Sequence, residues 1–121
     1  MTLHFVAIVD DDEALCSSLV DLMRSVGYRA EPFASAEALL MSADLSSFGC
    51  IIADVHMSGM SGLRLIQELH ELEITTPVIL ITALPDTHLD EKAVSIGAQG
   101  LLRKPFEIGA LLDRVERSLL K

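Results

Sequence analysis

Three consecutive aspartates follow an apolar run near the start of the chain. The run Phe5–Val9 reads FVAIV, and Asp10, Asp11 and Asp12 come directly after it. Adjacent carboxylates repel one another and raise one another's pKa unless a cation or a hydrogen-bond donor compensates the charge. The three side chains therefore either face open water or hold a positively charged group.

Other apolar runs also end in polar residues that could do chemistry. Asp54 follows the run that begins at Cys50, Thr82 follows the run that begins at Val78, and Lys104 follows the last short run. Any one of these residues has an ordinary explanation as a helix cap, a loop hydroxyl or a solvated charge. Together, the acids offer the oxygen ligands that Mg²⁺ prefers, and the hydroxyl and the ammonium are donors that bind phosphate. The pattern predicts a magnesium and phosphate site if these segments end at one place.

Five apolar runs of strand length alternate with segments of helical periodicity. The runs do not alternate polar with apolar residues, which is typical of strands buried on both faces. We expect strands at Phe5–Val9, Arg29–Phe33, Cys50–Ala53, Val78–Ile81 and Gly100–Leu102. We expect helices within Leu15 to Val26, Ser35 to Leu40, Ser61 to Leu72, Thr87 to Gly97 and Ile108 to Leu119.

This alternation predicts an α/β fold with a doubly wound parallel sheet. Right-handed crossovers leave few topologies, and the five-stranded, flavodoxin-like order 2-1-3-4-5 with five helices fits this length best. In such a sheet, ligands bind beyond the carboxyl ends of the strands, where the strand order reverses. The polar residues that follow the strands should therefore meet at one edge of the sheet.

Length and composition exclude several classes of function. The 121 residues fit one domain, residues 1–121, and the formal net charge of −9 argues against direct binding of nucleic acid. No basic leader and no apolar run of about 18 residues indicates export or a membrane span, so we expect a cytoplasmic protein without membrane contact. Cys16 and Cys50 are expected to be buried free thiols. The sequence has neither a GxxxxGK loop nor a GxGxxG loop, which argues against nucleotide binding.

The segments that carry the polar residues resemble a known family. VDDDEALCSSLVDLM, CIIADVHMSGMSGLRLI, VILITA and GAQGLLRKPFE are similar, in order and spacing, to the receiver domain of two-component response regulators. SAEALL and TPVILITA are similar to FixJ-type receivers that precede a helix-turn-helix output. The resemblance implies a signalling switch and not an enzyme. A sensor histidine kinase would transfer a phosphoryl group to one aspartate with Mg²⁺ as cofactor, and a conformational change would control an output domain or partner, as in transcription regulation.

The resemblance assigns roles to the aspartates. Asp54 matches the phosphoacceptor, and Asp10 and Asp11 match the acidic pair at the metal, with Asp11 as a direct ligand and Asp10 acting mainly through water. Asp54 and the backbone carbonyl of His56 complete the expected metal ligands. Asp12 continues the acidic run, and we expect it to cap the following helix instead.

Four further residues match the phosphate-binding and switching part of the family's pattern. Thr82 matches the switch hydroxyl, and Ala83 supplies the small side chain that leaves room for phosphate. Lys104 matches the lysine that pairs with a phosphate oxygen, and Pro105 matches a residue commonly joined to it by a cis peptide bond. The resemblance also implies a phosphorylation-linked dimer through the face of the fourth helix, the last strand and the fifth helix.

Two positions depart from the family's pattern. Leu101 stands where an aromatic ring usually turns inward with the threonine, so the switch should be smaller or depend more on backbone shifts. Ser58 stands where this loop usually has proline, and Gly59 follows it. Losing the fixed φ of proline and gaining glycine should loosen the loop. The His56 side chain is expected in solvent, or else beside the phosphoryl group.

Other functions remain to be weighed against the switch. A magnesium-dependent phosphohydrolase on a similar sheet would use Asp54 as a turnover nucleophile, but it would want an acid two residues later, where this chain has His56. A receiver that binds partners without phosphorylation is a third reading, against which the complete set of acids, threonine and lysine argues. The chain could also act as a stand-alone receiver in a phosphorelay.

Overall fold

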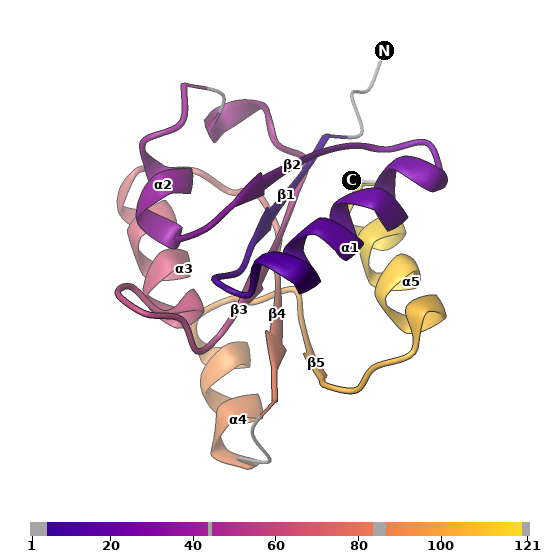
Figure 1. Ribbon diagram of the computed structural model, residues 1–121. Coiled ribbons are helices and arrows are strands. Elements are labelled where there is room, and N and C mark those ends of the chain that lie inside the picture. The colour runs from indigo at the N-terminus through magenta and orange to yellow at the C-terminus, as the bar shows by residue number, and fades with distance from the viewer. Residues whose placement is uncertain (1–4, 44, 84–86, 120–121) are drawn as a thin grey trace.

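The computed structural model describes residues 5–43, 45–83 and 87–119. Its core is one parallel sheet of five strands in the order β2-β1-β3-β4-β5 (Figure 1). The strands are β1 Phe5–Val9, β2 Arg29–Phe33, β3 Cys50–Asp54, β4 Val78–Thr82 and β5 Gly100–Arg103. The predicted fold class and strand order are confirmed. β3, β4 and β5 each extend one residue further than predicted, so that Asp54 and Thr82 are the last residues of their strands.

Five α-helices connect and cover the strands. They are α1 Glu13–Ser25, α2 Ala36–Leu40, α3 Gly62–Glu71, α4 Thr87–Ser95 and α5 Ile108–Leu119. α1 and α5 lie on one face of the sheet, and α2, α3 and α4 lie on the other (Figure 1). A 3₁₀ turn, η1 Leu45–Ser47, precedes β3 and was not predicted.

Side-chain caps begin three of the helices where the sequence places them. Asp12 accepts a hydrogen bond from the N–H of Leu15 at 3.1 Å, which confirms its role as the cap of α1. Ser35 caps α2 and Ser61 caps α3 in the same way. The positive φ of Gly27, 95°, fits its position just after α1, where a left-handed residue ends a helix.

Both faces of the central strands are buried, which explains why their sequences do not alternate. In β1, Ala7 and Val9 pack toward α2 and α3, whereas Val6 and Ile8 pack toward α1 and α5. The strands β3 and β4 are buried at every residue. The two apolar clusters hold the sheet rigidly between its helices, so the ends of the central strands are fixed relative to one another.

The two cysteines belong to the buried core. Cys16 and Cys50 are buried and free, as predicted. Burial raises the pKa of the Cys50 thiol to about 12, so this side chain stays protonated at neutral pH. None of the helices in the described ranges is long and apolar enough to cross a membrane.

Candidate functional site

The polar residues that end the strands meet at the carboxyl edge of the sheet. Asp10 directly follows β1, Asp54 ends β3, Thr82 ends β4 and Lys104 directly follows β5. Asp10, Asp54 and Thr82 are 3%, 8% and 0% exposed. Polar groups at this depth are costly unless they are hydrogen-bonded or paired. The edge is therefore a built site whose charges must be compensated by neighbouring groups.

Lys104 supplies much of that compensation. Its Nζ lies 2.8 Å from Oδ2 of Asp54 and 3.7 Å from Oδ2 of Asp10. Burial alone lowers the pKa of Lys104, but the hydrogen bond to Asp54 and the charges of Asp54 and Asp10 outweigh this effect, so its pKa is raised. The ammonium is thus held in its charged form between two carboxylates.

Each of the two buried carboxylates also accepts a backbone hydrogen bond from two residues ahead. Oδ1 of Asp54 accepts from the N–H of His56 at 2.9 Å, and Oδ1 of Asp10 accepts from the N–H of Asp12 at 2.9 Å. Turns of this kind fix the orientation of an aspartate side chain. Burial raises the pKa of Asp10, and the charge of Asp54 adds to this rise, although the bond from Asp12 opposes it.

Asp11 is placed differently from its two neighbours. Its side chain is exposed, and Oδ2 accepts hydrogen bonds from the backbone N–H of Ser58 at 2.9 Å and from the Ser58 hydroxyl at 3.2 Å. The backbone bond from Ser58 is the main reason why the pKa of Asp11 is lowered. The Asp11 carboxylate is therefore held toward the loop after β3.

Thr82 and Lys104 are joined through their backbones. The N–H of Lys104 donates to the carbonyl of Thr82 at 2.7 Å, which continues the pairing of β4 with β5 beyond the last strand residue. The Lys104–Pro105 peptide bond is cis, as the family resemblance implied. Ala83, which follows Thr82, is exposed and has only a small side chain. A displacement of the lysine backbone would be felt directly at Thr82.

Two residues around the site were missed in the sequence. A Cβ added to Gly62 would lie 2.6 Å from the backbone oxygen of Asp54, so only glycine lets α3 begin this close to the end of β3. Oε2 of Glu37 accepts a hydrogen bond from the N–H of Met60 at 3.2 Å. The glycine at the start of a helix was a visible signal, whereas the Glu37 contact joins α2 to a loop 23 positions away and left none.

The carboxylate oxygens of the site are suitable ligands for a hard cation, although the acidic side chains do not form a complete coordination shell. In the part of the chain that the structure describes, no three acidic, histidine or cysteine side chains come close enough together to hold a metal ion. Mg²⁺ keeps several waters and commonly binds through only one or two carboxylates. Such carboxylates are offered by the buried Asp10 and Asp54 and by the exposed Asp11. The negative charges of Asp54 and Asp11 act on Asp10, and a bound cation would relieve this repulsion. His56 directs its backbone N–H to Asp54, while its side chain is exposed.

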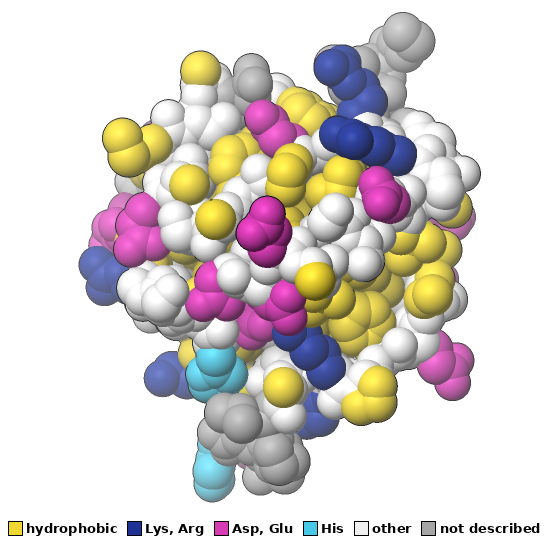
Figure 2. Space-filling model, viewed as in Figure 1, with side chains coloured by type: hydrophobic (Ala, Val, Ile, Leu, Met, Phe, Trp, Pro, Cys, Tyr) yellow, Lys and Arg dark blue, Asp and Glu magenta, His cyan; other side chains and the backbone are white. Residues whose placement is uncertain are grey.

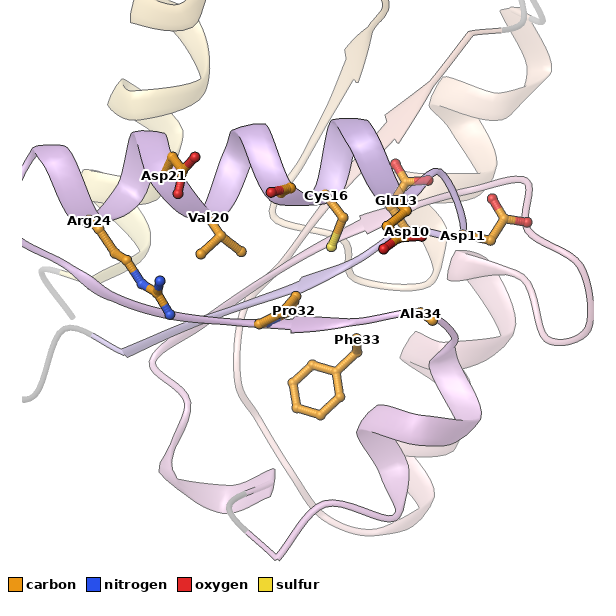
Figure 3. A pocket seen from close by; sticks show the side chains of 11 residues that line it. Asp10, Asp11, Glu13, Cys16, Val20, Asp21, Arg24, Pro32, Phe33 and Ala34 are labelled. Carbon is orange, nitrogen blue, oxygen red and sulfur yellow. The ribbon is translucent and has the colours of Figure 1, made fainter.

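The site opens to solvent on one face of the molecule. Figure 2 shows acidic side chains gathered with basic ones near the middle of this face, where α1 begins. A groove of about 630 Å³ runs between α1 and β2, and Asp10, Asp11 and Glu13 line its end (Figure 3). The groove thus reaches Asp10 and Asp11 from the side of β2, whereas Asp54 does not line it.

The sequence and the fold both match known proteins. The sequence model of the response regulator receiver domain family matches residues 6–116 of this chain. The crystal structure of FixJ-N has a TM-score of 0.89 and 32% identity to this chain, covering 99% of this chain and 96% of that one. Chemotaxis protein CheY4 of Vibrio cholerae has a TM-score of 0.87 and 27% identity, covering 97% and 99% of the two chains.

Curated relatives are longer than this chain. The response regulator protein TodT of Pseudomonas putida is 38% identical over 114 residues, which are 94% of this chain and 50% of TodT. The transcriptional regulatory protein FixJ of Rhizobium meliloti is 35% identical over 118 residues, which are 98% of this chain and 58% of FixJ. The chain thus spans about half the length of the curated relatives that it matches.

Proposed function

Because this chain belongs to the response regulator receiver family, a family of signalling proteins, we propose that its switch is set by transfer of a phosphoryl group from a sensor histidine kinase to Asp54, with Mg²⁺ as cofactor. The observation that carries the proposal is the convergence of Lys104 on Asp54 and Asp10 at the carboxyl edge of the sheet. A buried carboxylate beside a fixed ammonium can attack a phosphoryl group whose negative charge the ammonium offsets.

The transfer exchanges one bond to phosphorus for another. A carboxylate oxygen of Asp54 forms a bond to phosphorus as the bond to the kinase histidine nitrogen breaks, and the histidine keeps the electron pair of that bond. Lys104, which contacts Oδ2 of Asp54 before the reaction, can follow the negative charge to the phosphoryl oxygens. The backbone N–H of His56 holds Oδ1 of Asp54 and so orients the attacking carboxylate.

Magnesium would be held by the acids around Asp54. We assign Asp11 as a direct ligand, Asp10 as a ligand that acts mainly through water, and Asp54 and the backbone carbonyl of His56 as the remaining protein ligands. When bound, the ion supplies positive charge for the oxygens of the phosphoryl group. The donor set supports this assignment because it consists of oxygens, which Mg²⁺ prefers over nitrogen and sulfur.

The conformational signal would begin at Lys104 and Thr82. The ammonium contacts Oδ2 of Asp54, the residue that would carry the phosphoryl group, and the lysine N–H is bonded to the Thr82 carbonyl. A shift of the Lys104 backbone on phosphorylation would therefore displace Thr82. Arg103, next to Lys104, makes two hydrogen bonds to Asp90 of α4, at 3.2 Å and 3.0 Å, so a shift at the end of β5 would reach α4.

The output would be read from the surface that α4, β5 and α5 form. We propose that phosphorylation promotes dimerisation through this surface, and that the chain acts with an output domain that regulates transcription. The lengths and names of TodT and FixJ support an additional domain, since this chain covers 50% and 58% of them. Leu101, half-buried in β5, takes the place of an aromatic ring, so backbone shifts should carry more of the signal.

Phosphorylation by a small acyl phosphate tests the proposal without knowledge of the kinase. The wild-type protein should gain the mass of one phosphoryl group in the presence of Mg²⁺, and much less after chelation of the metal. Asp54→Asn should gain none, whereas Asp113→Asn, on the exposed surface of α5, should behave like wild type. Equal uptake by wild type and Asp54→Asn would contradict the assignment.

A further inference from the structure

The Asp11 carboxylate is held by a residue of the loop between β3 and α3. Ser58 donates two hydrogen bonds to Oδ2 of Asp11, one from its backbone N–H at 2.9 Å and one from its hydroxyl at 3.2 Å. The two residues are 47 positions apart, so the contact joins the loop after β1 to the loop after β3. Bonds to an ionised acceptor are stronger than bonds between neutral groups.

A second carboxylate holds the same loop two residues later. Oε2 of Glu37, in the first turn of α2, accepts from the N–H of Met60 at 3.2 Å. Gly59 lies between the two contacts with a φ of 84°, and a Cβ on it would lie 2.8 Å from the Glu37 carboxylate. Glycine thus lets the loop pass close to Glu37. The loop that carries Ser58 is thus held by two carboxylates, Asp11 at Ser58 and Glu37 at Met60.

This contact keeps Asp11 apart from the other acids. In Figure 3 the Asp11 carboxylate points away from Asp10. Among residues 5–43, 45–83 and 87–119, no three acidic, histidine or cysteine side chains are close enough together to hold a metal ion. A cation bound jointly by Asp11 and by Asp10 or Asp54 requires their carboxylates to converge. The two bonds from Ser58 to Oδ2 oppose such a turn of the Asp11 carboxylate.

We propose that Ser58 is a latch on Asp11, which holds this carboxylate outside the metal site in the metal-free protein and releases it when magnesium binds. The inference rests on the proposed function, because it takes Asp11 as a magnesium ligand. The latch stabilises only the metal-free state, and therefore it weakens magnesium binding. It also couples occupancy of the site to the position of residues 57–60. Proline at position 58 could form neither bond, since it has no N–H and no hydroxyl.

Titration calorimetry of Mg²⁺ into the metal-free protein tests the latch. Ser58→Pro should lower the Kd for Mg²⁺ about threefold to tenfold, as the loss of partly solvated bonds to a charged group implies. Ser58→Ala removes the hydroxyl but keeps the backbone N–H, so its Kd should fall by only about twofold. Ser18→Ala, an exposed serine of α1, is the matched control and should leave the Kd unchanged.

Hydrogen exchange at the amide of residue 58 gives a second readout in the unaltered protein. The bond to Asp11 slows exchange of this amide in the metal-free state, and addition of Mg²⁺ should speed it up. This measurement and Ser58→Ala decide the matter even if Ser58→Pro does not fold. An amide that stays equally protected with Mg²⁺ bound would overturn the latch.

The calorimetric outcomes separate the latch from the proposed function. If the wild-type protein binds Mg²⁺ and the Ser58 variants bind it equally well or more weakly, the latch is wrong and the proposed function stands. A weaker-binding Ser58→Pro would mean that Ser58 orients Asp11 for the metal. If the wild-type protein binds no Mg²⁺ at all, the proposed function fails, and the latch fails with it.

Discussion

The ammonium of Lys104 lies 2.8 Å from Oδ2 of Asp54, although their strands are not neighbours in the sheet. β4 lies between β3 and β5, so the lysine side chain crosses the end of β4 to reach the aspartate. The backbone bond from Lys104 to Thr82, at the end of β4, anchors the lysine for this crossing. The three residues that are proposed to bind and sense phosphate are thus one connected unit before any phosphate arrives.

Lys104→Met should destabilise the metal-free protein by about 1–3 kcal/mol. The substitution leaves the buried carboxylate of Asp54 without its charged partner, and it leaves the repulsion between Asp54 and Asp10 uncompensated. Urea unfolding at neutral pH measures the change. Lys92→Met, on the exposed surface of α4, should change the free energy of unfolding by less than about 0.5 kcal/mol. Equal effects of both variants would contradict this role of Lys104.

Asp10→Asn should stabilise the metal-free protein at neutral pH. The pKa of Asp10 is raised above its usual value of 3.8, so the folded state binds this proton more tightly than the unfolded state. Its contribution to stability is therefore present at low pH and is lost as pH rises through the folded pKa. Unfolding curves between pH 4 and 7 should show the gain of the variant growing with pH. A gain that shrinks with rising pH would contradict the raised pKa.

Gly59→Ala should lower the free energy of unfolding by about 1–2 kcal/mol. A residue with a side chain adopts the φ of 84° at a cost, and the added Cβ would also push against the Glu37 carboxylate. Gly109→Ala is a matched control with the opposite sign. Its Cβ would meet open space in α5, and alanine favours a helix over glycine by up to about 1 kcal/mol. Thermal or urea unfolding of both variants checks the difference.

Asp11→Ala and Asp12→Ala should respond differently to magnesium. Asp11→Ala should lose the rise in melting temperature that Mg²⁺ gives the wild-type protein, because a ligand of the ion is gone. Asp12→Ala should keep this rise and lose about 1 kcal/mol in all conditions, since Asp12 caps α1 through the N–H of Leu15. Calorimetric melts with and without millimolar Mg²⁺ measure both effects. Loss of the metal response in Asp12→Ala alone would reverse these roles.

The residues at the carboxyl edge of the sheet could be predicted because the ends of the apolar runs in the sequence show where the strands end. Apolar runs buried on both faces show where the strands lie, and parallel strands bring their ends to one edge. Asp10, Asp54, Thr82 and Lys104 were found in this way, and the structure brings them together. The 3₁₀ turn Leu45–Ser47 was missed because three residues are too short to show a period.

The contacts of the β3–α3 loop could not be predicted in the same way. Ser58 and Gly59 suggested only a loop freed from proline, whereas the structure adds bonds from Ser58 to Asp11 and from Met60 to Glu37. These bonds join residues 47 and 23 positions apart, and both donors lie in a loop, which has no hydrophobic period. The pairing of β1 with β3 brings Asp11 near Ser58, and the packing of α2 and α3 on the same face of the sheet brings Glu37 near Met60.

Borohydride reduction of the phosphorylated protein tests the central claim most directly. The reagent reduces an aspartyl phosphate to homoserine, which releases the phosphate and marks the residue permanently for peptide mass spectrometry. After treatment with a small acyl phosphate and Mg²⁺, homoserine is expected at position 54 and in no other peptide. Homoserine at position 10, 11 or 12, with Asp54 unmodified, would contradict the assignment of Asp54 as the phosphoacceptor.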